Sequence, residues 1–221
     1  MLDFVHPMEI TWFGHCSFLL RGATLAVVTD PFDDSLGYRP GKAQADVVTM
    51  SSPGPAHGNI GMVMGYRKTL SGPGEYEIAD VFIFGIKTFR DAAQGAERGR
   101  NTVYRVLMDG LVLCHLGAIG HIPTADQVSA IGDVDVLFVP VGGGNALTPA
   151  QATEVVSLLE PKVIIPMHYR VPGIASTLEP VDAFLKEQGV AGVEPVPRLA
   201  VTTSSIPAGP QVVVLEPRQQ R

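Results

Sequence analysis

Short apolar runs separated by glycine and proline restrict the fold of this chain more than any other feature. Gly and Pro together make up 42 of the 221 residues, which suits many short strands joined by tight turns. Asp109-Gly110 lies between two such runs and favours a two-residue hairpin turn, because both residues tolerate a positive φ. Runs rich in β-branched and aromatic residues predict strands at residues 10–13, 17–20, 25–29, 45–50, 81–87, 102–108 and 111–115.

Helix signals appear in the second half of the chain. Two Thr-x-x-Gln capping boxes, beginning at Thr124 and Thr148, each open a helix. Gly132 ends the first of these helices, and Pro161 stops the second. The expected elements of this half are helices at 124–132, 148–160 and 178–188, and strands at 134–140, 163–167, 199–203 and 211–215.

Two glycine-rich segments are expected to be turns. Residues 142–145, Gly-Gly-Gly-Asn, join an apolar strand to a capped helix, as phosphate-binding loops do. They lack the P-loop lysine and the dinucleotide spacing, so a tight turn of closely approaching backbone is the better interpretation. Residues 72–76, Gly-Pro-Gly-Glu-Tyr, are interpreted as a turn on the same grounds.

Composition and charge limit the class of protein. Hydrophobic residues make up 46% and charged residues 17%, which is typical of a globular chain. The formal net charge is −6 and no Lys/Arg run exceeds two residues, so neither a nucleic-acid partner nor a membrane partner is expected. No repeat or linker divides the chain, and we expect a single domain over residues 1–221.

The two cysteines, Cys16 and Cys114, lie far apart in the sequence and outside any Cys-x-x-Cys motif. They are expected to be buried, reduced thiols. The first residues carry neither a basic segment nor an apolar one of the kind found in signal peptides. We therefore expect a cytoplasmic protein.

The segment from residue 46 to residue 60 suggests a function. An apolar strand ends at Met50 and is followed by a Pro/Gly-rich loop that contains His57. This arrangement resembles the metallo-β-lactamase superfamily, whose zinc loop reads His-x-His-x-Asp-His after such a strand. On that pattern Ser52 and Gly54 replace the first two histidines and Ala56 replaces the aspartate, whereas His57 is kept.

The resemblance extends over residues 8–216, and it is closest to the branch of small Zn-dependent hydrolases that includes ascorbate-6-phosphate lactonase-like proteins. That branch has a Gly-His pair after the first strand and an Asp-Pro pair after the third, found here as Gly14-His15 and Asp30-Pro31. The resemblance implies an α+β fold, the αβ/βα four-layer sandwich. In this fold two mixed sheets pack face to face, with helices outside.

The remaining ligand positions of the family are mostly lost as well. The resemblance places the third zinc histidine at Arg90, and it places a bridging aspartate at Ala118, in the segment His115-Leu-Gly-Ala. The last histidine is kept as His168, within Ile-Pro-Met-His-Tyr. Only His57 and His168 therefore remain of seven implied ligands.

The chemistry of these replacements opposes a binuclear zinc centre. Gly54, Ala56 and Ala118 have no side-chain donor atom, and Ser52 is a poor neutral ligand. The Arg90 guanidinium has no lone pair to offer and remains protonated. At ~4 Å from a divalent ion it costs about 8 kcal/mol if the effective dielectric constant is near 20. No cofactor is expected, with zinc at low occupancy as the exception.

Arg90 has several interpretations. It pairs with Asp91 or with Asp30, it replaces the lost charge of the metal, or it binds the phosphate or carboxylate group of a ligand. His57 and His168 are expected to meet in one pocket with it. Ser51 and Ser52 near His57 do not predict a serine hydrolase, because the Gly-x-Ser-x-Gly elbow is missing.

The other histidines are expected to be structural. His15, His115 and His121 lie at the ends of predicted strands, where a backbone carbonyl can accept their N–H. His6 is expected to be exposed. The leading hypothesis is therefore a metallo-β-lactamase-fold protein without a working binuclear zinc centre, which binds a small anion or self-associates. The alternative is a hydrolase of a small ester, lactone or phosphorylated substrate that keeps a single metal, with help from Asp30 or His15.

Overall fold

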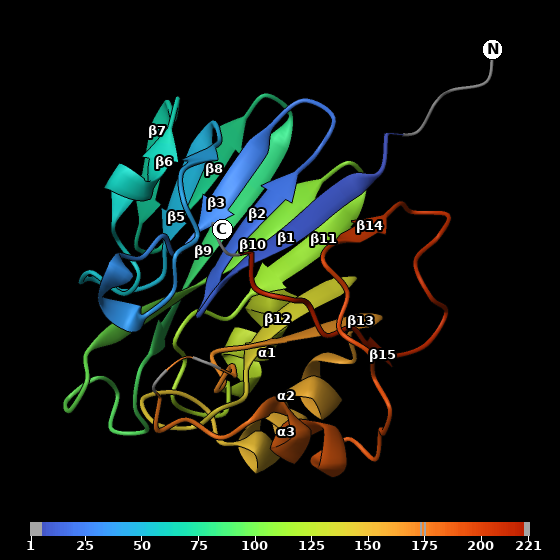
Figure 1. Cartoon of the computed structure of the whole chain (residues 1–221). Coiled ribbons are helices and arrows are strands. Elements are labelled where there is room, and N and C mark those ends of the chain that lie inside the picture. The colour runs from blue at the N-terminus through green and yellow to red at the C-terminus, as the bar shows by residue number, and fades with distance from the viewer. Residues whose placement is uncertain (1–5, 173, 175, 219–221) are drawn as a thin grey trace.

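The computed structural model describes residues 6–172, 174 and 176–218, and most of its strands form two large sheets (Figure 1). In spatial order, the first sheet of the described chain contains β14 (Leu199–Val201), β1 (Met8–Gly14), β2 (Ser17–Arg21), β3 (Ala26–Thr29), β5 (Val47–Met50) and β7 (Lys68–Ser71). Strands β14, β1, β2 and β3 are antiparallel neighbours, whereas β3, β5 and β7 run parallel to one another. This sheet is therefore mixed, as expected.

The second sheet is mixed in the same way. In spatial order its described strands are β15 (Gln211–Val212), β13 (Val163–Met167), β12 (Val136–Pro140), β11 (Leu111–His115), β10 (Arg100–Met108), β9 (Val81–Phe89) and β8 (Gly74–Ile78). The first four run parallel, and the last four form antiparallel pairs. A small parallel pair, β4 (Ala43–Gln44) and β6 (Val63–Met64), lies beside the two sheets.

The helices of the described chain follow strands of the second sheet. They are α1 (Ala125–Ile131), α2 (Pro149–Leu159) and α3 (Val181–Glu187), with short 3-10 turns η1 (Asp34–Leu36) and η2 (Ile60–Met62) elsewhere. Both predicted capping boxes are present, at Thr124 and at Thr148. The third helix begins at Val181 rather than at 178, because Pro180 is its N-cap and the residue before a proline disfavours helical geometry. No helix in the described residues is long and apolar enough to cross a membrane.

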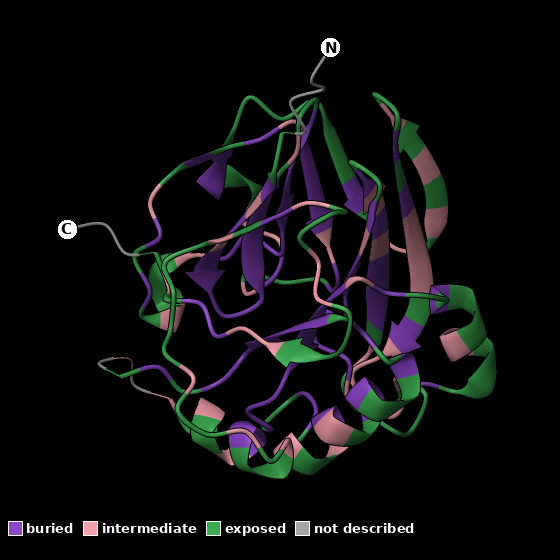
Figure 2. Ribbon diagram, turned by 90° about the vertical axis from the view of Figure 1, so that its right-hand side faces the viewer, coloured by how far each residue is buried: buried purple, intermediate pink, exposed green. Residues whose placement is uncertain are grey.

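Aromatic side chains from both sheets meet in the core. Phe18 on β2 and Phe138 on β12 have ring centroids 4.6 Å apart, so the inner faces of the two sheets are in direct contact. Trp12 on β1 packs against Tyr169, with a centroid distance of 5.1 Å. Figure 2 shows most strand residues in the buried colour, whereas the helices have one buried side and one exposed side. The molecule is thus an α+β sandwich with its core between the sheets.

Local signals predicted some elements better than others. Asp109 and Gly110 have φ of 52° and 75°, as the predicted hairpin turn requires. The prediction of a turn over residues 72–76 was wrong from Gly74 onward, where strand β8 begins and pairs with β9. Strand β7 was missed as well, because its sequence Lys-Thr-Leu-Ser has only one buried side chain.

Strand direction brings the functional candidates to one edge of the sandwich. Strands β1, β3 and β5 point the same way in the first sheet, and β9, β11, β12 and β13 do so in the second. Four of them, β1, β3, β9 and β13, end directly before a candidate, and these candidates are His15, Asp30, Arg90 and His168. Loops from both sheets therefore meet at their carboxyl ends, where α/β proteins commonly bind ligands.

Candidate functional site

A cavity of about 640 Å³ lies at this edge. Its lining brings together side chains that are far apart in the sequence, such as His15 and His168, which are 153 positions apart. The residues singled out from the sequence that line it are His15, Ala56, His57, Arg90, Ala118 and His168, and they are joined by Ser35, Leu36, Tyr38, Asn145, Ile174, Ser176, Thr177 and Leu178. The expectation that His57 and His168 share a pocket with Arg90 agrees with this arrangement.

Three residues at the cavity edge have strained backbones. His15, Asp30 and His168 have φ of 50°, 40° and 52°, in the left-handed region that side chains other than glycine seldom adopt. The surrounding hydrogen bonds hold them there. The backbone N–H of His168 donates to the His15 carbonyl over 3.0 Å, and the indole of Trp12 donates to the same carbonyl over 3.1 Å. Strain of this kind is often concentrated at functional sites.

Asp30 and His57 form a buried pair. Asp30 is fully buried and accepts hydrogen bonds from the Ser51 backbone N–H, over 2.6 Å, and from the Ser51 hydroxyl. His57 Nδ1 lies 2.8 Å from Asp30 Oδ2. Burial raises the pKa of Asp30. The charge of His57 and the hydrogen bonds from His57 and Ser51 lower it by more, so the pKa lies below its usual value. An ionised Asp30 fixes the proton of His57 on Nδ1, and Nε2 then carries a lone pair unless the ring is fully protonated.

His15 and His168 form a second pair, with their Nδ1 atoms 3.1 Å apart. Burial, followed by the charge of neighbouring histidines and Arg90, lowers the pKa of His15 well below its usual value and that of His168 to about 4. Two neutral rings share this contact as a hydrogen bond only if one Nδ1 is protonated and the other is not. The Nε2 atoms then provide one donor and one acceptor.

Neither of these Nε2 atoms has a hydrogen-bond partner in the described chain, although both are buried. A buried polar atom without a partner costs about 1–3 kcal/mol. The two histidines therefore offer unused hydrogen-bonding or ligating capacity at the cavity.

Arg90 is half-buried and follows strand β9 directly. Its guanidinium forms no ion pair with any described carboxylate, and its Nε is buried without a partner. The two ion pairs considered from the sequence are thus not formed. Asp91 instead accepts hydrogen bonds from the backbone N–H groups of Gly95 and Arg98, and Asp30 is occupied by Ser51 and His57.

Close packing of the Gly120 backbone against the backbone of Phe89 and Arg90 holds Arg90 in place. Gly120 donates its N–H to the carbonyl of Phe89, just before Arg90. A Cβ atom on Gly120 would lie 2.0 Å from the Arg90 carbonyl oxygen, so no other residue fits there without a shift of the backbone. The loop after β11 is therefore packed tightly against the loop that carries Arg90.

Two of the five lost ligand positions do not line the 640 Å³ cavity. Ser52 and Gly54 line a second cavity, on the other side of the loop that carries His57. The resemblance had implied that all five lost positions surround one centre, and only Ala56, Arg90 and Ala118 line the cavity with His57 and His168. Residues 51–55 of this loop therefore line the second cavity, whereas Ala56 and His57 line the first.

These residues do not fit a binuclear zinc centre. Ala56 and Ala118 offer no donor atom, and Arg90 adds a fixed positive charge. A single ion fits better, since His15, Cys16 and His168 offer ligand atoms within 4.8 Å of one another, as do Cys16, Asp30 and His57. Burial raises the pKa of the Cys16 thiol well above its usual value, which disfavours the thiolate that a metal requires.

The remaining histidines divide as follows. His115 Nε2 lies 2.7 Å from the Cys16 carbonyl. His121 accepts a hydrogen bond from the Phe89 N–H over 3.2 Å, and its Nδ1 donates to the Ile122 carbonyl. Both histidines are therefore structural, as expected. His6 is exposed, also as expected. His15 differs, because its ring lines the cavity and contacts His168, so the prediction of a backbone carbonyl as its partner was wrong.

Sequence reasoning named Asp30 and His15 only as helpers that it could not position. The signal that could have found them is their shared context, since each is a polar residue directly after an apolar strand, at Gly14-His15 and Asp30-Pro31. Tyr38 was not identified, and Asn145 was named only as the end of the glycine-rich turn at residues 142–145. They come from irregular segments, where the sequence carries no periodic signal.

The fold and the site together define a class of protein. Two mixed sheets enclose the core, and loops at the carboxyl ends of their strands bring histidines and an aspartate into one site. A model of the beta-lactamase superfamily domain matches residues 9–168, and the chain belongs to this superfamily. The resemblance found in the sequence and the α+β sandwich that it implied are thereby confirmed.

Relatives and solved structures agree with this assignment. The UPF0173 metal-dependent hydrolase of Thermococcus kodakarensis is 24% identical over 203 residues, covering 78% of this chain and 89% of the relative. That of Carboxydothermus hydrogenoformans is 26% identical over 199 residues, covering 76% and 88%. A metallo-beta-lactamase superfamily structure from Thermotoga maritima is 40% identical and covers 95% of this chain and 98% of that one, with a TM-score of 0.78. Igni18, a metallo hydrolase from Ignicoccus hospitalis, is 19% identical with a TM-score of 0.63, a likeness of fold alone.

Proposed function

We propose that this protein has lost binuclear zinc hydrolysis and binds a small anion in the 640 Å³ cavity. The observation that carries the proposal is the Arg90 side chain, a fixed cation that lines the cavity and has no carboxylate partner among the described residues. A half-buried charge without a counter-ion is unfavourable. An anion that pairs with it therefore binds the folded state selectively and stabilises it.

The surroundings of Arg90 support a carboxylate or phosphate as that anion. The planar guanidinium matches the geometry of both groups and binds them through two parallel hydrogen bonds. The His15–His168 pair adds one buried N–H donor, and Asn145 adds an amide at the same cavity. His57 becomes a further donor when its ring is protonated, because Asp30 already accepts from its Nδ1. The proposed ligand class is thus a small molecule that carries one such group.

A hydrolase with a single metal, acting on a small ester, lactone or phosphorylated substrate, is the second candidate. The distance between the Nδ1 atoms of His15 and His168 favours this candidate. The names of the curated relatives also describe metal-dependent hydrolases. Two ligands of a tetrahedral zinc with Zn–N bonds of 2.0–2.1 Å are about 3.3 Å apart, close to the 3.1 Å between the Nδ1 atoms of His15 and His168. When bound, zinc supplies a Lewis acid and an activated water. The chain itself would hold His57 in place through Asp30.

Metal content distinguishes the two candidates. The protein should be purified without chelator and its metal measured per chain by elemental analysis. We expect far less than one zinc per chain, because Arg90 repels a divalent cation in this cavity. Zinc near one per chain that is lost in His15→Ala and His168→Ala would favour the single-metal hydrolase and refute the leading proposal.

Anion binding is tested by thermal shift with inorganic phosphate, sugar phosphates and small carboxylates. At a hundredfold excess over Kd, binding adds about 2.7 kcal/mol, which raises Tm by roughly 5–10 °C for a chain of this length. Arg90→Gln should abolish the shift. Arg105→Gln is the matched control, since Arg105 lies on β10 against the Phe84 ring and does not line the cavity. Equal shifts in wild type and Arg90→Gln would show that Arg90 is structural.

The proposal extends to location and assembly. Cys16 and Cys114 are free and buried, which supports a cytoplasmic protein because thiols stay reduced there. Self-association is the second activity expected of a member without hydrolase chemistry, and light scattering with and without phosphate measures it.

A further inference from the structure

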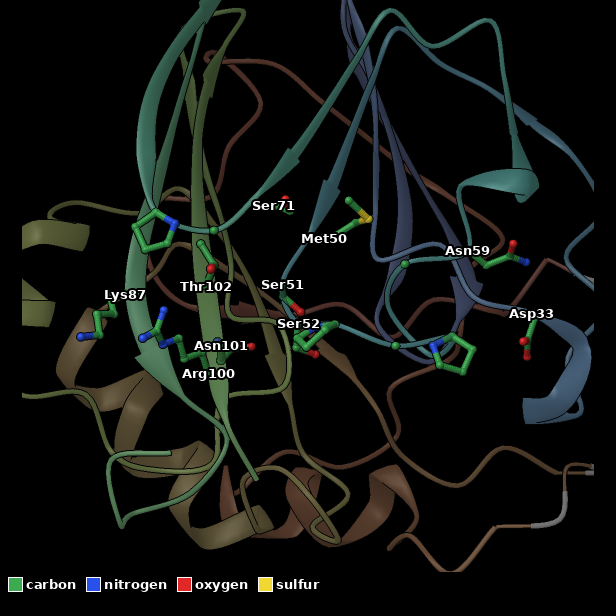
Figure 3. Close-up of a pocket in the computed structure, with 16 residues that line it drawn as sticks. Asp33, Met50, Ser51, Ser52, Asn59, Ser71, Lys87, Arg100, Asn101 and Thr102 are labelled. Atoms are coloured by element: carbon green, nitrogen blue, oxygen red, sulfur yellow. The ribbon is translucent and has the colours of Figure 1, made fainter. Parts of the chain in front are cut away.

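The second cavity is larger than the one that contains Arg90. Its volume is about 840 Å³, and it opens between the two sheets at the edge where β5, β9 and β10 end or begin (Figure 3). In Figure 3, Lys87, Arg100 and Thr102 lie on one side, Asn59 and Asp33 lie on the other, and Ser51 and Ser52 lie between them. The residues that line it differ entirely from those of the 640 Å³ cavity. It is therefore a separate candidate site.

One wall of this cavity carries two cations. In the pairing of β9 with β10, Lys87 lies opposite Thr102 and Phe89 lies opposite Arg100. Side chains alternate between the faces of a strand, so these four residues share one face. Lys87 and Arg100 are exposed and form no ion pair with the described carboxylates, and Lys87 Nζ lies 5.5 Å from the Phe89 ring centroid. Two unpaired cations beside each other attract an anionic group.

The rest of the lining combines polar side chains, including Asp33 on the far side, with an apolar part. Met50, Pro53, Pro55 and Pro73 form that apolar part, and their side chains have no hydrogen-bonding atoms apart from the weakly accepting sulfur of Met50. Such surface favours a ligand with an apolar body. The cavity therefore combines an apolar wall with a cationic wall, as sites for amphipathic acids do.

A buried hydroxyl in the lining gives an independent indication of a ligand. Ser52 lines the cavity with only 5% of its surface exposed, and its Oγ has no hydrogen-bond partner among the described residues. Neighbouring polar side chains differ in this respect, since Asn101 donates to Thr88 and to the Leu116 carbonyl. An unpaired hydroxyl in a buried position is costly unless a ligand or a water completes it.

We propose that the 840 Å³ cavity binds an organic monocarboxylate of medium size, with its carboxylate at Lys87 and Arg100 and its apolar body against Met50 and the prolines. This site goes beyond the anion site at Arg90, because it selects for an apolar body that the histidine-lined cavity does not require. Charge complementarity fixes the orientation of the ligand, and the contact with Met50 places a reporter group beside it.

The experiment uses the full chain with ¹³C-methyl-labelled methionine, and the probe is octanoate. The Met50 methyl resonance, assigned with Met50→Leu, should shift saturably on titration, whereas that of the core residue Met167 should not move. Acetate carries the head group alone and octan-1-ol carries the apolar body alone. Both are expected to bind at least about tenfold more weakly than octanoate, a difference of about 1.4 kcal/mol.

Variants separate this site from the other cavity. Lys87→Gln/Arg100→Gln should weaken octanoate binding at least about tenfold, and Arg105→Gln, on the same strand but outside the cavity, should leave it unchanged. Arg90→Gln should also leave it unchanged, so that failure of the proposed anion site and failure of this one are distinguishable. The proposal is overturned if Met50 does not respond to about 10 mM octanoate, if octan-1-ol binds as well as octanoate, or if the double variant binds like the wild type.

Discussion

Asp30→Asn should be among the most destabilising conservative substitutions in this protein. Asp30 is fully buried, and its Oδ2 faces two donors, the Ser51 hydroxyl and His57 Nδ1. The Asn amide that replaces this oxygen is itself a donor, so the two contacts no longer match unless Ser51 and His57 both reorient. Removing the charge of a buried carboxylate from its hydrogen-bonding partners costs about 3–5 kcal/mol. For a chain of this length the loss corresponds to a fall in Tm of roughly 6–20 °C.

Urea denaturation followed by circular dichroism measures this loss directly. The matched control is Asp46→Asn, because Asp46 pairs with the exposed side chain of Arg67 over 2.9 Å, and this change should cost about 1 kcal/mol. A double-mutant cycle of Asp30→Asn with His57→Gln should give a coupling of about 0.5–3 kcal/mol, as expected for residues in contact. A loss below about 1 kcal/mol for Asp30→Asn would refute the inference that the pair is tightly held.

Three further predictions concern protons, packing and metal. Because burial lowers the pKa of both His15 and His168 in the folded state, the free energy of unfolding should fall as pH drops below about 6.5, by up to about 1.4 kcal/mol per pH unit for each histidine. For His168 this fall ends near its folded-state pKa of about 4. A pH series of urea melts should lose this slope in His15→Gln/His168→Gln and is contradicted by a flat profile in the wild type. Gly120→Ala should destabilise by about 1–3 kcal/mol because its Cβ overlaps the Arg90 carbonyl; an unchanged urea midpoint would show that the loop moves freely. Thermal melts with and without EDTA should superimpose, since the core is apolar and needs no metal cage, and a fall of many degrees with EDTA would show that a metal supplies folding energy.

The parts of the fold with strong local signals could be predicted from the sequence. The capping boxes at Thr124 and Thr148 and the turn at Asp109-Gly110 depend only on neighbouring residues, and all three occur as expected. Strand β8 did not follow its local glycine-proline signal. Its backbone is held by pairing with β9, which the local sequence does not encode.

The candidate site could be predicted only where a motif fixed the residue. His57 and His168 came from the superfamily pattern, and they line one cavity with Arg90. His15 was expected to bond a backbone carbonyl at the end of its strand, and no local signal links it to its actual partner, His168, which lies 153 residues away. Ser52 and Gly54 were expected at the same centre, but the curvature of their loop turns them to the opposite side. Spacing along a loop does not reveal which way each side chain faces.

The left-handed backbones of His15, Asp30 and His168 have a consequence for protein engineering. Each costs on the order of 1–3 kcal/mol, whereas a whole domain is stable by only about 5–15 kcal/mol. Glycine adopts the same backbone angles without that cost. A selection for heat resistance alone should therefore enrich glycine at positions 15 and 168. Position 30 is not included, because glycine there would remove the buried carboxylate of Asp30. A selection that also demands ligand binding should retain the histidines. The positions at which the two selected populations differ would mark the residues that the protein keeps for binding at the expense of stability.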